Sequence, residues 1–171
     1  MNSDMLRVLK GAMDSEKDGF KTHLKYAIET TSADGKNMYI NLAMDEHNHV
    51  LKLHTKLTQM VAELLKNTRF QPDNIEEILA YQESSESEVP IQTVVPKEET
   101  AILEMAIENE ISSKKFYTEL AEKSDGPIFH ALYSGLAKEE ERHEVLLKAE
   151  LDCVKGNGYW FDFREFTLEA P

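Results

Sequence analysis

Apolar residues recur along most of this chain at spacings of three, four or seven positions, which is the periodicity of an amphipathic α-helix. Turn-forming residues interrupt this pattern and divide it into long segments. The pattern therefore predicts an all-α protein with four long helices, at about residues 3–30, 36–66, 98–123 and 128–154, and it places Met44 and Phe116 among the apolar positions expected in the core.

The connections between these helices differ in length. The breaks near residues 31–35 and 124–127 are short, and short loops between long helices join antiparallel neighbours. Residues 67–97 contain three prolines and an acidic, serine-rich run, with room for a short helix at 73–81. This stretch is long enough to carry the chain back along a bundle. We expect two antiparallel hairpins joined by this crossover, forming a four-helix bundle over residues 1–155.

Residues 156–171 form a tail that is rich in aromatic side chains. A segment this apolar is stabilised by burial, so we expect it to pack on the bundle or on a second subunit. The second arrangement favours a homodimer over a larger cage. The aromatic residues of the tail are Tyr159, Trp160, Phe161, Phe163 and Phe166.

Charge and cysteine content restrict the partners and the compartment. The net charge of −13 argues against binding to nucleic acid or to an anionic membrane surface. Cys153 is the only cysteine, so the sequence has neither a disulfide framework nor the thiolates of a rubredoxin-type iron site. No apolar run has the length of a transmembrane helix, and the N-terminus does not resemble a signal peptide. We expect a cytoplasmic protein.

Two Glu-x-x-His motifs lie inside the predicted helices, one at Glu46 and His49 and the other at Glu140 and His143. Residues three apart lie on the same face of a helix, so each motif can direct a carboxylate and an imidazole at one ion. One such motif is weak support for a metal site, because acidic helices contain it by chance.

An internal repeat links the two motifs. Their glutamates are 140 − 46 = 94 positions apart, and the same shift also superposes His49 on His143 and Glu16 on Glu110 without a gap. A generic amphipathic repeat would match leucines and alanines, but it would not also match three polar positions in register. We infer that the two hairpins share one design and are related by a pseudo-twofold axis.

Four glutamates and two histidines are then expected to converge at the centre of the bundle. Four buried carboxylates would repel one another, and two divalent cations remove this repulsion by neutralising their charge. Glutamates from two helices with Glu-x-x-His motifs from the other two form the di-metal arrangement of carboxylate bundle proteins. Oxygen and imidazole ligands without thiolates suit iron best, with manganese or zinc as alternatives.

At these positions the chain resembles the rubrerythrin branch of the ferritin-like superfamily, over about residues 6–151 and in the ferritin-like domain only. The resemblance rests on the six candidate ligands and on the segments around Glu110 and Glu140. It implies a ferritin-like bundle with two metal ions. The implied roles are bridging or chelating carboxylates for Glu46 and Glu140, terminal carboxylates for Glu16 and Glu110, and one metal each for His49 and His143.

The chain departs from the rubrerythrin pattern in two ways. Rubrerythrins carry a further carboxylate ligand one turn before the glutamate of the third helix, where this chain has Ile107. They also carry a rubredoxin domain that feeds electrons to the metal centre, and the single cysteine here cannot form one. Reduction of a substrate would therefore require an external electron donor protein.

Several other polar residues have competing interpretations. His47, His54 and His130 are expected at the surface, as are Glu139 and Glu141, although Glu139 or Asp45 could instead orient a ligand histidine. His23 matches Tyr117 under the repeat and either supports a ligand or fills a polar core position. Tyr39 and Tyr133 either hydrogen-bond the glutamates or fill the core.

Three functions are consistent with these features. The first is an oxidoreductase that reduces O₂ or hydrogen peroxide at the two metals, with no catalytic residues separate from the ligands. The second is iron binding without turnover, as in delivery, sensing, ferroxidase activity or storage. The third is a bundle that has lost its metal, which the intact set of six ligands disfavours.

Overall fold

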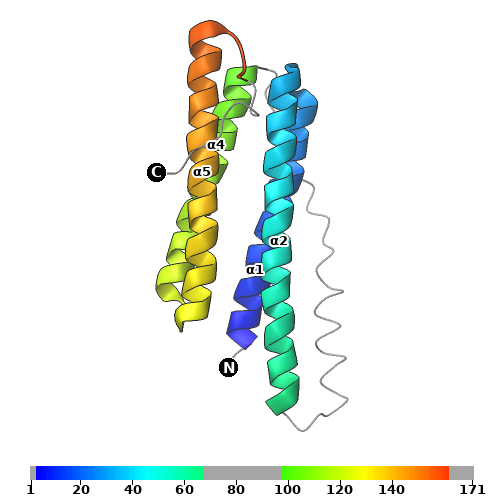
Figure 1. The fold of residues 1–171 in the computed structure, drawn as a ribbon, viewed down its shortest axis with the longest axis vertical. Coiled ribbons are helices and arrows are strands. Elements are labelled where there is room, and N and C mark those ends of the chain that lie inside the picture. Colours follow the sequence, from blue (N-terminus) through cyan, green and yellow to red (C-terminus); the bar gives the residue numbers. More distant parts are fainter. Residues whose placement is uncertain (1–2, 68–97, 162–171) are drawn as a thin grey trace.

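The computed structural model describes residues 3–67 and 98–161. These residues form α1 (Ser3–Glu29), α2 (Ala33–Asn67), α4 (Glu99–Lys123) and α5 (Pro127–Asn157), which confirms the predicted all-α fold (Figure 1). The crossover, the short helix predicted at 73–81 and the end of the tail lie outside the described residues. Among the four described helices, none is long and apolar enough to cross a membrane.

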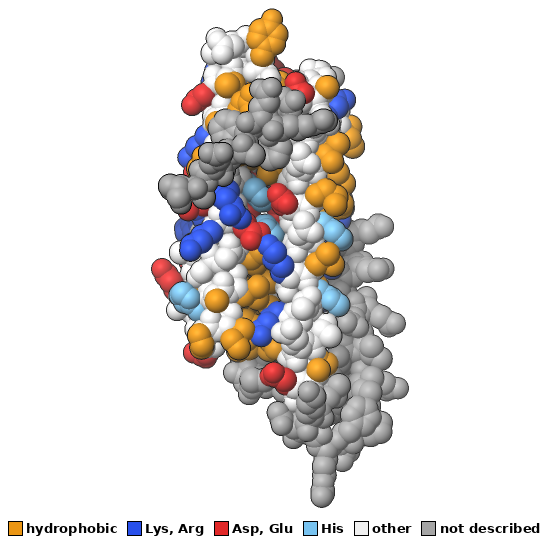
Figure 2. Space-filling view, viewed as in Figure 1, with side chains coloured by type: hydrophobic (Ala, Val, Ile, Leu, Met, Phe, Trp, Pro, Cys, Tyr) orange, Lys and Arg blue, Asp and Glu red, His pale blue; other side chains and the backbone are white. Residues whose placement is uncertain are grey.

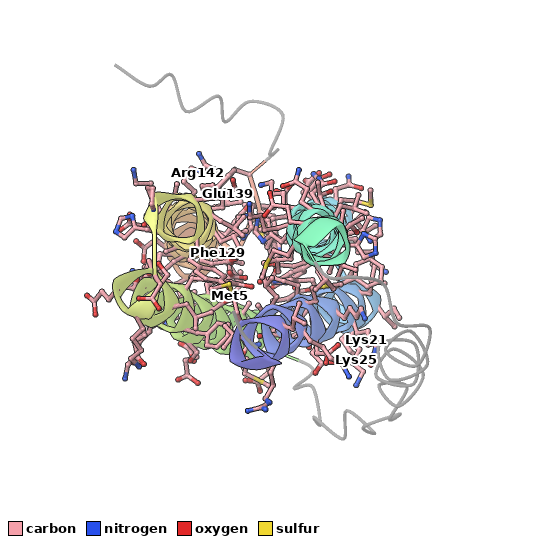
Figure 3. The ribbon with its side chains drawn as sticks, turned by 90° about the horizontal axis from the view of Figure 1, so that it is seen from below. Met5, Lys21, Lys25, Phe129, Glu139 and Arg142 are labelled. Atoms are coloured by element: carbon pink, nitrogen blue, oxygen red, sulfur yellow. The ribbon has the colours of Figure 1, made fainter. Side chains whose placement is uncertain are left out.

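The helices form two antiparallel hairpins, α1 with α2 and α4 with α5 (Figure 1). Figure 3, which looks along the bundle, shows α5 and α2 in one layer and α4 and α1 in the other. Packing is extensive within each hairpin, whereas α1 and α4 touch each other only sparsely. The line between the two hairpins is therefore where side chains from all four helices meet.

The turn of the first hairpin is tied to the start of the second. The backbone N–H of Thr31 donates to Glu99 Oε1 at 2.6 Å, and the Thr31 hydroxyl donates to the same oxygen. The helix α2 begins at Ala33, inside the predicted turn, so Gly35 is helical. A Cβ at Gly35 would lie 2.6 Å from Thr30 Cγ2 and 2.9 Å from the Trp160 ring. Glycine at this position therefore permits close packing of the turn and the tail.

The end of α5 passes directly into the tail. Gly158 adopts a left-handed conformation with φ 74°, and its N–H donates to Val154 O at 3.0 Å, which caps the helix. Trp160 then packs edge-on against Tyr39 with ring centroids 5.9 Å apart, and Phe161 lies against the same apolar core. The described part of the tail thus packs on the bundle, while Phe163 and Phe166 lie outside the described residues.

Two buried apolar clusters fill the interior. One joins α1 and α2 near the hairpin turn to the start of α4 and the later part of α5. The other joins the start of α1 to the later parts of α2 and α4 and the start of α5. Their largest fully buried members are Tyr26, Met38, Tyr39, Leu42, Ile102, Leu103 and Leu147 in the first, and Leu9, Leu53, Tyr117 and Leu136 in the second.

Two residues that the periodicity places in the core lie at the surface instead. Met44 is 51% exposed and Phe116 is 37% exposed. Successive helical residues turn by about 100°, so Met44 points away from the buried Leu42, and Phe116 cannot share the inward direction of its neighbour Tyr117. These expectations were wrong because an apolar residue next to the buried stripe need not belong to it.

Candidate metal centre

All six candidate ligands meet at one place between the two apolar clusters. Each helix contributes, and each of the six residues is at most 7% exposed. The heptad-like stripe that buries leucines along each helix also carries these residues inward, because they occupy the same face. We call the set the ligand cluster: Glu16 from α1, Glu46 and His49 from α2, Glu110 from α4, and Glu140 and His143 from α5.

The ligand cluster divides into two overlapping groups of four. Glu46 and Glu140 belong to both groups, one of which adds Glu16 and His49 while the other adds Glu110 and His143. Within each group, one potential ligand atom per residue lies within 4.8 Å of all the others. The geometry therefore offers two adjacent cation positions that share two carboxylates. We call them the first position, with His49, and the second position, with His143.

Each histidine points its Nδ1 atom at three carboxylates. His49 Nδ1 lies 3.0 Å from Glu16 Oε2, 3.1 Å from Glu46 Oε2 and 3.2 Å from Glu140 Oε1. At the second position, His143 Nδ1 lies 3.4 Å from Glu140 Oε2, 3.5 Å from Glu110 Oε2 and 3.6 Å from Glu46 Oε1. Each position thus surrounds one imidazole nitrogen with three oxygens from three helices.

The outer nitrogen of each histidine faces a carboxylate from the opposite hairpin. His49 Nε2 lies 2.6 Å from Glu139 Oε2, which also accepts a hydrogen bond from Lys52 at 2.5 Å. His143 Nε2 lies 3.5 Å from Asp45 Oδ2. Such partners fix the ring orientation and the protonated nitrogen of a ligand histidine. Both residues that the sequence offered as alternatives therefore take this place, one for each histidine.

The two terminal glutamates are also contacted crosswise. Tyr117 on α4 donates its hydroxyl hydrogen to Glu16 Oε1 on α1. His23 on α1 places Nε2 at 2.9 Å from Glu110 Oε1 on α4 and at 3.7 Å from Glu46 Oε1. His23 and Tyr117 correspond under the 94-residue shift. This correspondence is the sequence feature that indicated a supporting role for His23.

The second hairpin is the part of the chain that is similar to a known protein family. Residues 101–165 match the Rubrerythrin family model. This match confirms the resemblance to the rubrerythrin family. No curated protein and no solved structure matches the chain. The matched stretch contains Glu110, Glu140 and His143, and the internal repeat relates it to the first hairpin.

Ile107 is the point at which the structure departs from the rubrerythrin pattern. It lies one turn before Glu110, is 7% exposed and packs in the apolar cluster with Leu103. An apolar side chain cannot ligate a cation, so the ligand cluster has no additional carboxylate at this position. The donor set is therefore limited to four glutamates and two histidines with the nearby His23.

Burial and mutual contact shift the pKa values of the cluster strongly. Burial raises the pKa of Glu16 to about 8, and the neighbouring carboxylates of Glu46 and Glu140 add to this rise. Although burial opposes the charged form of an imidazole, close contacts with the carboxylates of Glu140, Glu16 and Glu46 raise the pKa of His49 to about 12. Without a metal, the negative charge of the cluster is therefore reduced by protons held on its histidines and on Glu16.

Several cluster atoms have no hydrogen-bond partner within the described residues. They include both carboxylate oxygens of Glu140 and the Nδ1 atom of His143, all of which are buried. Buried polar atoms normally have partners, and atoms left without one in a group of acids and imidazoles are typical of ligands. Their donor chemistry, oxygen and imidazole nitrogen without sulfur, fits iron or manganese. The residues present therefore fit a pair of divalent cations.

The remaining polar residues behave largely as expected. His47, His54 and His130 are exposed, and the His47 ring lies against Phe20 with centroids 6.0 Å apart. The hydroxyl groups of Tyr39 and Tyr133 are buried without a hydrogen-bond partner among the described residues. These tyrosines therefore fill the core and do not hold the glutamates.

Proposed function

We propose that this chain is a di-iron carboxylate protein that reduces hydrogen peroxide or O₂ at the ligand cluster. The observation that carries the proposal is the pair of overlapping, buried four-residue groups that share Glu46 and Glu140. The family match over α4 and α5 supports it, because rubrerythrins use such a centre. Iron is preferred to zinc because the proposed reaction requires a change of oxidation state.

Each residue of the cluster has a separate role in this proposal. Glu46 and Glu140 would hold both ions, and the other four residues would hold one ion each. Glu16 and His49 belong to the first position, and Glu110 and His143 to the second. Two ferrous ions supply two electrons, which together with two protons reduce one molecule of hydrogen peroxide to two of water.

The surrounding residues hold this arrangement in place. Asp45 and Glu139 fix the rings of the ligand histidines, and His23 and Tyr117 hold the terminal glutamates. The apolar clusters on both sides keep the ligands buried within the bundle, which strengthens the electrostatic attraction between the carboxylates and a cation. The scaffold is therefore preorganised for two cations before they bind.

An external electron donor protein, a cytoplasmic location and a homodimeric state complete the proposal. The first follows from the absence of rubredoxin-type thiolates in a sequence with one cysteine. The cytoplasmic location rests on the single cysteine, which is typical of a protein in a reducing compartment. The homodimeric state rests on the aromatic tail.

The proposal is tested by loading the purified protein anaerobically with ferrous iron and counting the bound metal. We expect two irons per chain, and the near-ultraviolet absorption of ferric iron should develop on addition of one equivalent of hydrogen peroxide. A variant in which Glu46 and Glu140 are both replaced by alanine serves as the control and should bind no iron. Two bound irons that remain ferrous with peroxide and with air would indicate metal binding without turnover.

A further inference from the structure

A polar cleft leads from the surface to the ligand cluster between α1 and α4. Its volume is about 390 Å³, and three of the six ligands form part of its lining: Glu16, Glu46 and Glu110. It lies between two helices of different hairpins, which pack against each other far less than the helices within each hairpin do. These helices form the layer behind α5 and α2 in Figure 1, so the cleft opens on the face opposite to that in Figure 2.

The walls of the cleft are built from small polar residues at equivalent positions of the two hairpins. Ser15 and Gly19 line it on α1, while Asn109 and Ser113 line it on α4. The 94-residue shift pairs Ser15 with Asn109 and Gly19 with Ser113. Short side chains at all four positions leave the space between α1 and α4 open, whereas larger ones would fill it.

Gly19 leaves one of the shared ligands open to this space. A Cβ at Gly19 would lie 3.5 Å from Glu46 Cγ and 3.8 Å from Glu46 Oε2, which is ordinary van der Waals contact. Alanine would fit here without strain. A longer side chain would extend from this point into the cleft and cover the carboxylate that both cation positions share.

His23 gives the cleft a buried polar group without a partner. Its side chain lines the cleft, the residue is 3% exposed, and Nδ1 makes no hydrogen bond within the described part of the chain. The other ring nitrogen is directed at Glu110. A buried imidazole nitrogen with no partner is costly to leave unsatisfied, so a small polar ligand in the cleft would remove a penalty.

On the opposite face, the hollow formed by the described residues does not include the ligands. The hollow between α2 and α5 is lined by Asp45, Lys52 and Glu139 but by none of the six ligands. The ion pair of Lys52 with Glu139 lies over the His49 ring on this face. Figure 2 shows basic, acidic and histidine side chains gathered between the two helices there.

We infer that the cleft between α1 and α4 is the binding channel through which small polar ligands reach the two cation positions. The ligand class is a di- or triatomic oxygen or nitrogen species, neutral or with a single charge. The carboxylates at the inner end of the cleft disfavour larger and multiply charged anions. This inference rests on the proposed metal centre.

The test uses cobalt(II) as the metal and azide as the small ligand, so that no turnover is required. Gly19→Leu obstructs the cleft from α1, and Ser113→Leu obstructs it from α4. Gly11→Leu is the matched control, because a Cβ at Gly11 meets nothing within 4 Å. Each protein is loaded with two equivalents of cobalt, and azide association is followed by stopped-flow visible absorption.

We expect the azide association rate to fall by at least about tenfold in Gly19→Leu and Ser113→Leu and to stay at the wild-type value in Gly11→Leu. Gly19→Ala should also bind azide at the wild-type rate. Wild-type rates in both obstructed variants, with two cobalt ions bound, would overturn the channel and leave the metal centre standing. Failure of the wild-type chain to bind cobalt would instead overturn both. If Gly19→Leu fails to fold, Ser113→Leu alone decides.

Discussion

Each hairpin supplies two glutamates and one histidine as ligands, but the terminal glutamates of the two hairpins have opposite electrostatic surroundings. Burial raises the pKa of Glu16 to about 8. Burial would also raise the pKa of Glu110, but close contacts with His143 and His23 lower it to about 2. The equivalent carboxylates differ because Glu110 faces two histidines that can carry charge, whereas Glu16 faces one histidine and the neutral Tyr117.

This difference shows that the ligands are the same in the two hairpins, whereas the residues that contact the ligands differ. The ligands themselves match in both hairpins, because a cation position needs the same donor atoms wherever it lies. The residues behind the ligands need only present a donor or an acceptor at the right place, and they differ: His23 against Tyr117, and Asp45 against Glu139. The bundle is therefore symmetric in its ligands and asymmetric in their support.

The largest expected effect distinguishes shared ligands from unshared ones. Glu46→Ala or Glu140→Ala should reduce bound metal from two ions per chain to none, because both positions use these carboxylates. Glu16→Ala or Glu110→Ala removes a ligand of one position only and should leave about one ion per chain. Elemental analysis after equilibrium dialysis against ferrous iron or cobalt(II) measures the difference.

His47→Ala is the control for these variants, because His47 is exposed and adjoins the cluster only in sequence. It should retain both ions. A His47 variant that empties the centre, or a Glu46 variant that keeps both ions, would show that the cation positions are not those described.

A smaller effect should reveal the asymmetric support of the two positions. Tyr117→Phe removes the hydrogen bond to Glu16, and His23→Phe removes the contact with Glu110. Loss of such a partner weakens metal binding by about 10- to 100-fold. Tyr117→Phe should weaken the first position. His23→Phe should weaken chiefly the second, because His23 lies closer to Glu110 than to the shared Glu46. Two-step cobalt(II) titration calorimetry resolves the two effects.

The reciprocal change sharpens the same comparison. His23→Tyr gives both terminal glutamates a tyrosine partner and should bring the two stepwise affinities closer together. Equal weakening of both steps by Tyr117→Phe and by His23→Phe would mean that the two positions are coupled and not separately supported.

Much of this design could be predicted from the sequence, since it depends on local periodicity and on the repeat. The helices follow from apolar spacing, and the 94-residue shift identified Glu16 and Glu110, which belong to no local motif. The predicted burial of Met44 and Phe116 was wrong, because these apolar residues lie beside the buried face of their helices and not on it. Both are exposed at the surface of the bundle.

The contacts between the two hairpins could not be predicted from the local sequence pattern. The repeat paired Asp45 with Glu139 and His23 with Tyr117, but it did not indicate that each residue serves a ligand of the opposite hairpin. That arrangement depends on how α1–α2 and α4–α5 are docked, as does the cleft between α1 and α4. No sequence pattern records the separation of two helices that are distant along the chain.

The smallest expected effect concerns a position where the hairpins differ away from the metal centre. Glu150 is fully buried in α5, whereas the 94-residue shift pairs it with Lys56 of α2, which is not buried. The Phe161 N–H donates to Glu150 Oε2 at 3.4 Å, while the other oxygen has no hydrogen-bond partner among the described residues. Burial, with a contribution from Asp34, raises the pKa of Glu150 to about 7.

A raised pKa means that the folded state binds this proton more tightly than the unfolded state, whose carboxyl has the ordinary pKa of 4.5. The resulting stabilisation is fully present below pH 4.5 and is lost as the pH rises through about 7. Cobalt-loaded wild-type protein should therefore melt a few degrees lower at alkaline pH than at mildly acidic pH, whereas Glu150→Gln, which cannot ionise, should lack this part of the change. Glu141→Gln, at an exposed position of the same helix, should retain the wild-type profile in thermal melts followed by circular dichroism. Identical profiles for Glu150→Gln and wild type would show that Glu150 stays charged in the folded bundle, with its charge stabilised by groups other than Phe161.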